Sequence, residues 1–294
     1  MLLFSRFTPN VLLSAAVALS VILAAVMLGL AIDQRWLGLK LEAQPRLAIP
    51  VSFEGLWIDA IEHDSPAAGQ PGAGIPASVA SLVSLGGPDG RRIQLTPQDL
   101  MEEPDALETY AGMRAFFARQ DEIAAVLRSI GGVELGIAFL GETQTYSVSP
   151  KRQRPVASLP PSFWMQIGVG LAGFWIGAWI WSLRRGEWAT RFLFLAGAGL
   201  MISAFPAAVY STRELALPGG LFRVLSTFNH IGALTFGVGM IGLFLVYPRT
   251  LVSPRWLALP AIVLGAWQIV DILQLANGPG LGFHLAVVLA MLAI

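Results

Sequence analysis

The feature that most constrains this chain is a run of 22 residues without a charge, from Val11 to Ile32. A helix of this length can cross a bilayer core of about 30 Å. The alternative is a cleaved signal peptide, since Gly29-Leu30-Ala31 offers a weak cleavage site. Signal-peptide cores are typically about 7–15 residues long, so this run favours an uncleaved transmembrane anchor over residues 1–32.

Further apolar segments follow a polar block. They are Ser162–Leu183, Phe192–Ser211, Val224–Tyr247, Trp256–Leu275 and a stretch from about 281 to 294. The last has 14 residues, too few to span, so we expect the parent chain to continue beyond Ile294 and to carry any output domain there. Charged residues make up only 13% of the chain, against about 25% in soluble proteins. The sequence therefore predicts a polytopic α-helical membrane protein, with residues 162–294 as its multi-span region.

Arginines in the short loops predict the orientation of these spans. One set of loops holds Arg184, Arg185, Arg191, Arg249 and Arg255, and the alternate loop holds Arg213 and Arg223. Basic residues accumulate in cytoplasmic loops. We therefore expect a cytoplasmic N-terminus and an extracytoplasmic polar block.

The polar block, residues 33–161, has the patterns of a folded domain. It contains 16 acidic and 11 basic residues, against 3 and 8 in the rest of the chain. Strands are expected at Phe53–Ile61, Leu82–Leu85, Arg92–Leu95, Val133–Phe139 and Thr143–Ser149, and helices from Thr96 and from about Asp105 to Ile130. The block is thus predicted to be an inserted extracytoplasmic α+β domain of about 100 residues, large enough for its own core.

Motifs in this block resemble those of the PDZ family. The motifs are the segment Gly55, Leu56, Trp57 and Ile58, the turn Ser65-Pro66-Ala67 and the final hairpin Val133–Pro150. The resemblance implies that backbone amides around Gly55–Ile58 receive a peptide terminus by β-augmentation. Ala77-Ser78-Val79 stands where that family has a Gly-Asp pair, so the alternative is a domain that only packs against the membrane part.

One span, a PDZ-like domain and then several closely spaced spans resemble the sensor region of ComP-type membrane histidine kinases. That resemblance implies a signal-sensing input module in a bacterial inner (cytoplasmic) membrane, with a periplasmic domain and a peptide or small-molecule signal. It also implies a homodimer that signals to a response regulator through a kinase domain. No kinase motif occurs in these residues, so whether the parent protein is an enzyme stays open.

Polar residues within the spans are candidates for function, because they are costly in lipid. They are Asn229, His230, Gln268, Asp271 and His284. All fall in the outer part of spans that short loops connect, so we expect a polar pocket that binds a ligand or responds to protonation. The alternative is that they are interfacial or join helices.

Other classes of function lack their residues. The histidines do not form a His-Glu-x-x-His zinc site, and Asp271 has no second acidic residue within a span, as an aspartyl intramembrane protease requires. There is no cysteine and no phosphate-binding loop, so no catalytic residue, metal or cofactor is expected, and no nucleic-acid partner. A membrane scaffold or adaptor with a peptide-binding domain and a transporter fragment remain as alternatives.

Overall fold

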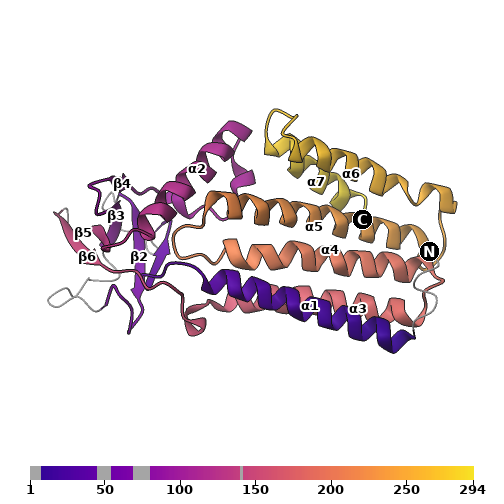
Figure 1. Ribbon diagram of the computed structural model, residues 1–294. Helices are drawn as coiled ribbons and strands as arrows, with labels where there is room; N and C mark the ends of the chain where they lie inside the picture. The colour runs from indigo at the N-terminus through magenta and orange to yellow at the C-terminus, as the bar shows by residue number, and fades with distance from the viewer. Residues whose placement is uncertain (1–7, 45–53, 69–79, 140–141) are drawn as a thin grey trace.

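The computed structural model describes residues 8–44, 54–68, 80–139 and 142–294. A helical bundle carries an α+β domain at one end (Figure 1). Within these residues, four helices are long and apolar enough to cross a membrane: α1 (Pro9–Ile32), α3 (Pro161–Leu183), α4 (Trp188–Tyr210) and α5 (Gly219–Val246). At 1.5 Å per residue the shortest measures about 35 Å, enough for a bilayer core. The prediction of a polytopic membrane protein is confirmed.

The apolar segment Trp256–Leu275 forms a shorter helix than the sequence indicated. Helix α6 (Leu259–Ile272) has 14 residues and rises only about 21 Å. It begins after a 3₁₀ turn, η4 (Pro254–Trp256), and the backbone leaves the helix where Gln274 takes a φ of 54°. A π-helical turn, η5 (Gly280–His284), then leads into α7 (Leu285–Leu292). Both α6 and α7 lie beside α5 (Figure 1).

Small residues let α4 and α5 approach closely. A methyl group added at Gly199 or at Gly232 would lie closer than 3.0 Å to backbone atoms of the opposite helix, around Phe236 and Ser203 respectively. Gly197 makes the same kind of approach to Gly173 on α3. Close backbone contact supplies van der Waals packing where the hydrophobic effect between helices is weak.

The inserted domain is built on one antiparallel sheet of order β1-β2-β3-β5-β6, with β4 also paired to β3. The strands are β1 (Leu39–Glu42), β2 (Leu56–Ile61), β3 (Ala80–Gly86), β4 (Arg92–Gln94), β5 (Val133–Phe139) and β6 (Glu142–Val148). The helical elements are η1 (Pro97–Leu100), η2 (Pro104–Ala106), α2 (Tyr110–Leu127) and η3 (Val156–Ser158). Thr96 and Asp99 form a capping box that begins η1, at the helix start that the sequence predicted at Thr96. The α+β prediction for this block is confirmed, and its identity as a PDZ domain stays a prediction.

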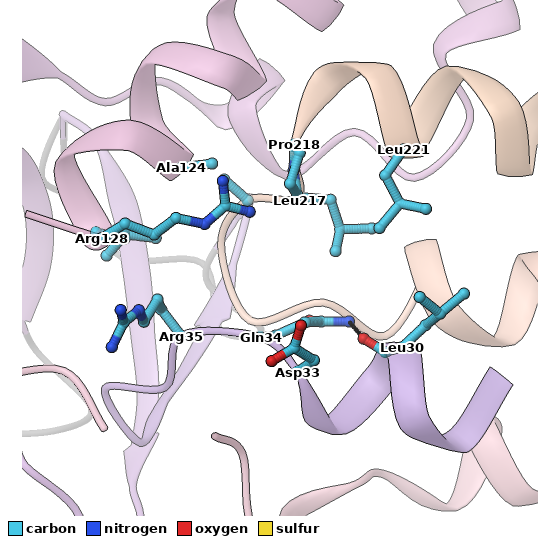
Figure 2. A pocket seen from close by; sticks show the side chains of 11 residues that line it. Leu30, Asp33, Gln34, Arg35, Ala124, Arg128, Leu217, Pro218 and Leu221 are labelled. Carbon is cyan, nitrogen blue, oxygen red and sulfur yellow. Dashed lines mark hydrogen bonds between the residues drawn. The ribbon is translucent and has the colours of Figure 1, made fainter. Parts of the chain in front are cut away.

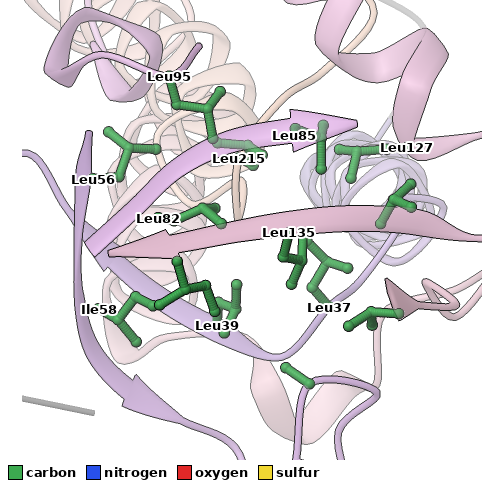
Figure 3. Close-up of a cluster of buried hydrophobic side chains, with 14 of the residues drawn as sticks. Leu37, Leu39, Leu56, Ile58, Leu82, Leu85, Leu95, Leu127, Leu135 and Leu215 are labelled. Atoms are coloured by element: carbon green, nitrogen blue, oxygen red, sulfur yellow. The ribbon is translucent and has the colours of Figure 1, made fainter. Parts of the chain in front are cut away.

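The core of the inserted domain includes a residue from the membrane part. Side chains of the sheet pack with Leu127 of α2 (Figure 3), and Ile123 of the same helix belongs to this cluster. Leu215, from the loop between α4 and α5, is only 2% exposed in the same cluster. The domain core is therefore completed by a loop of the bundle.

Replacing Gly232 with alanine should destabilise the bundle, because the added methyl forces α4 and α5 apart. Overpacking of this kind typically costs about 1–3 kcal/mol. The matched control is Gly168→Ala, since a Cβ at Gly168 meets nothing within 4 Å. Melting temperatures in detergent should fall for the first variant only, and equal values for the two variants would contradict the tight α4–α5 contact.

Candidate functional site

Polar side chains from the inserted domain and from the membrane helices meet in one place. We call them the acid–histidine cluster: Asp105 of η2, Tyr110 of α2, His230 of α5, Asp271 of α6 and His284 of η5. Three of these five residues are among those predicted from the sequence, and two come from the inserted domain. The cluster therefore joins the two parts of the molecule.

His230 stands between the two carboxylates of the cluster. Its Nδ1 lies 3.1 Å from Oδ2 of Asp271, and its Nε2 lies 3.7 Å from Oδ2 of Asp105. The ring stacks on Phe283, with centroids 3.7 Å apart and planes 5° apart. Each ring nitrogen thus faces a carboxylate oxygen. When the ring is doubly protonated, one N–H is directed at each carboxylate.

Tyr110 and His284 provide further partners of the two carboxylates. Nε2 of His284 lies 2.7 Å from Oδ2 of Asp105, and the Tyr110 hydroxyl donates to Oδ1 of Asp271 at 2.8 Å. Burial and the Asp271 carboxylate raise the pKa of the Tyr110 phenol, so Tyr110 stays a donor at neutral pH. The hydroxyl and the histidine nitrogens together surround both carboxylates.

Burial makes the loss of any one partner in the cluster costly. Asp105, His230 and Asp271 are 5–7% exposed, whereas the His284 side chain is 45% exposed. Removing one partner of a buried charged pair is strongly destabilising, because the other charge is left uncompensated. A cavity of about 60 Å³ borders His230, Asp271 and Arg223. The described residues hold no group of three or more His, Cys, Asp or Glu side chains arranged to bind a metal ion.

Two glycines let the loop after α6 reach the inserted domain. A Cβ at Gly278 would collide with the backbone carbonyl of Glu108, and one at Gly282 with the hydroxyl of Tyr110. Larger residues there would hold Tyr110 away from Asp271. The positions of these glycines thus follow from the geometry of the cluster.

Gln268 lies beside the cluster, and Asn229 points away from it. Nε2 of Gln268 lies 3.5 Å from Oδ2 of Asp271, and its buried Oε1 has no hydrogen-bond partner. Gln268 also borders a mostly apolar cavity of about 260 Å³ between α4, α5 and α6. Asn229 instead donates to the carbonyl and hydroxyl oxygens of Ser203 on α4, at 3.1 and 3.0 Å. Asn229 therefore joins two helices, the alternative role considered for these residues.

A second contact between the two parts is made by the loop between α4 and α5. Arg213 donates to the backbone carbonyls of Asp99 and Met101, at 3.2 and 2.6 Å, and its guanidinium lies 4.7 Å from the ring of Phe222. Burial lowers the pKa of Arg213 to about 10, so it remains a cation at neutral pH. The inserted domain thus supplies carbonyl dipoles to a buried charge.

Glu214, the next residue, binds the backbone at the start of β1. Its carboxylate accepts from the amides of Leu37 at 2.8 Å and Leu39 at 2.5 Å. Desolvation raises the pKa of Glu214 to about 7, although these hydrogen bonds and nearby Arg154 act in the opposite direction. This carboxyl group therefore titrates near neutral pH in the folded protein.

The residues of the predicted peptide-binding segment lie inside the sheet. Gly55 takes a φ of 85° just before β2, and Trp57 pairs with Glu42 of β1 on one side and Ser81 of β3 on the other. Both edges of β2 are thus occupied at this point. Peptide binding at Gly55, Leu56, Trp57 and Ile58 stays a prediction, and it would require β1 to leave the sheet.

Sequence reasoning missed Asp105 and Tyr110. Asp105 is 179 residues from His284, and Tyr110 is 161 residues from Asp271. Both lie at the start of a helical segment, where acidic and aromatic residues are common and do not by themselves indicate a site. The signal that the sequence did offer was the gathering of polar residues at one end of several spans.

The chain matches no protein-family model, no curated protein and no solved structure.

The titration of Glu214 predicts a pH-dependent stability. The folded-state pKa of about 7 exceeds the ordinary value of 4.5, so the folded protein binds more protons than the unfolded chain between these pH values. The free energy of unfolding should therefore fall as pH rises through this window, by on the order of 2 kcal/mol. The melting temperature of the wild type minus that of Glu214→Gln should decrease from pH 5 to pH 8. Exposed Glu142→Gln serves as control, and a difference that is flat or increases would contradict the assignment.

Removing the Tyr110 hydroxyl should weaken the cluster. The Tyr110→Phe variant leaves a buried Asp271 oxygen without its donor, at a cost of about 1–3 kcal/mol. Tyr146→Phe is the matched control, because that hydroxyl binds Gln144 on the exposed sheet. Thermal unfolding should show a lower melting temperature for Tyr110→Phe and little change for Tyr146→Phe. The same small effect in both would mean that the buried hydrogen bond contributes nothing.

Proposed function

We propose that this chain is the signal-sensing input module of a membrane sensor, of the kind that drives a histidine kinase in two-component signal transduction. The observation that carries the proposal is the acid–histidine cluster. It joins the inserted domain to α5, α6 and η5 through side-chain contacts between histidines, carboxylates and a tyrosine.

The chemistry of the cluster supports a sensing role. Histidine is the side chain that most readily changes charge near neutral pH. A neutral His230 ring can donate to only one of its two carboxylate neighbours, so it presents a lone pair to the other. A change of protonation, or a signal that moves η2, would therefore change how strongly Asp105 holds the membrane helices. A transmembrane response follows if the helices have two arrangements that this contact biases.

The layout supports a direction for the signal. Arg184, Arg185 and Arg191 lie near the α3–α4 loop, at the end of the bundle away from the inserted domain (Figure 1). Under the proposal this end is cytoplasmic, and the inserted domain is extracytoplasmic. A homodimer and a response regulator, reached through a kinase domain, would complete the pathway.

The continuous helices favour a sensor over a transporter. Transporters of the common folds bind substrate at helices broken near the middle of the membrane. Helix α4 runs from Trp188 to Tyr210 through Pro206 without interruption, and α5 is continuous over 28 residues. A scaffold or adaptor remains the second candidate, and it differs from a sensor because it needs no communication across the bundle.

Spin labels at the far end of the bundle test this difference. The chain has no cysteine, so Glu187→Cys and Thr250→Cys give a labelled pair without background. Asp105→Asn removes a charge from the cluster and should shift the distance distribution of this pair, measured by double electron–electron resonance in nanodiscs. Asp64→Asn, at a fully exposed carboxylate in the same domain, should leave it unchanged.

The outcome separates the two candidates. A shift with Asp105→Asn and none with Asp64→Asn supports transmission across the bundle. Identical distributions in the wild type and Asp105→Asn, with circular dichroism showing that both are folded, would contradict the sensor and favour the scaffold.

A further inference from the structure

A second polar cavity lies on the seam between the inserted domain and the bundle. It measures about 200 Å³ and is formed where the end of α1, the end of α2 and the start of α5 meet (Figure 2). Because α1 and α5 are spanning helices, this seam lies where lipid headgroups are expected. Leu30 of α1 and Leu221 of α5 give the cavity an apolar side.

The cavity holds two cationic side chains that come from different elements. Arg35 follows α1 and Arg128 follows α2 (Figure 2). Neither guanidinium forms an ion pair with a carboxylate in the described part of the chain. Guanidinium groups bind phosphate through parallel hydrogen bonds, so this pair is suited to a phosphate.

The same cavity is lined by one buried acceptor that lacks a donor, the side-chain oxygen of Gln34. Gln34 is only 6% exposed, and its Oε1 has no hydrogen-bond partner. The carboxylate of Asp33 lies next to the Gln34 side chain in Figure 2. A buried amide oxygen without a donor is unfavourable, so the site is incomplete until a donor enters it.

These groups together describe a zwitterionic ligand. We propose that the cavity binds the headgroup of phosphatidylethanolamine, with its phosphate on Arg35 and Arg128 and its ammonium donating to Gln34 beside the Asp33 carboxylate. The acyl chains would leave past Leu30 and Leu221. Phosphatidylcholine has a phosphate in the same place, but its quaternary ammonium has no N–H to donate to Gln34. This site goes beyond the sensing role and does not rest on it.

Lipid retention by the full chain tests the proposal. Native mass spectrometry would compare phosphatidylethanolamine, phosphatidylcholine and phosphatidylglycerol with identical acyl chains, each added to the delipidated protein. The wild type should retain phosphatidylethanolamine about tenfold better than phosphatidylcholine, as one hydrogen bond from a charged donor predicts. Gln34→Leu should bring this ratio close to one. Arg128→Ala should weaken both lipids and leave the ratio unchanged.

Matched variants keep the test decisive. Gln166→Leu, at a partly exposed glutamine near the same end of α3, and Arg184→Ala, at the other end, should behave as the wild type. Gln34→Glu keeps the acceptor oxygens and should keep the preference even if Gln34→Leu folds poorly. Equal retention of phosphatidylethanolamine and phosphatidylcholine by the wild type would overturn the proposal. A preference for phosphatidylglycerol, or loss of the preference in Gln34→Glu, would overturn it as well.

Discussion

The architecture depends on the burial of two adjacent charges, Arg213 and Glu214, in the loop between α4 and α5. Burying either charge without a partner would cost free energy. The inserted domain compensates them with backbone groups: carbonyls for Arg213, and the amides of Leu37 and Leu39 for Glu214. These partners exist only when the loop is docked. The bundle and the domain therefore form one structural unit. The docked loop fixes the position of the domain on the bundle, and the acid–histidine cluster is part of the same interface.

The two contacts differ in chemistry, and so in what they can do. The loop is held largely by main-chain groups of the domain, whose positions the fold determines. The cluster is held by side chains alone, from Asp105 to His284, and its hydrogen bonds depend on which nitrogens carry protons. The two contacts between the domain and the bundle therefore respond differently to substitution, since side-chain replacements can remove the cluster but not the main-chain partners of the loop.

Local sequence patterns predicted most of the helices and strands, but they did not predict how the inserted domain contacts the bundle. Run length predicted the four long helices, and the Thr96 cap and the Val133–Phe139 alternation predicted parts of the inserted domain. Polar residues within spans identified His230, Asp271, Gln268 and His284, but the same rule also selected Asn229, which joins two helices. Asp105 and the docked loop could not be predicted, because their partners are set by how the domain sits on the bundle. The length of α6 was overestimated, since apolar composition continues where the backbone leaves the helix.

The shared core has a consequence for biogenesis. The last strand of the inserted domain ends at Val148, but Leu215 leaves the ribosome 67 residues later, after α3 and α4. At synthesis rates of about 5–20 residues per second, this delay lasts roughly 3–13 seconds. During that interval the inserted domain has an unfilled core, and the amides of Leu37 and Leu39 lack the Glu214 carboxylate. Folding of the domain is therefore coupled to the membrane insertion of the α4–α5 hairpin. Residues 33–161 produced alone would lack Leu215 for their core and Glu214 for the amides of Leu37 and Leu39.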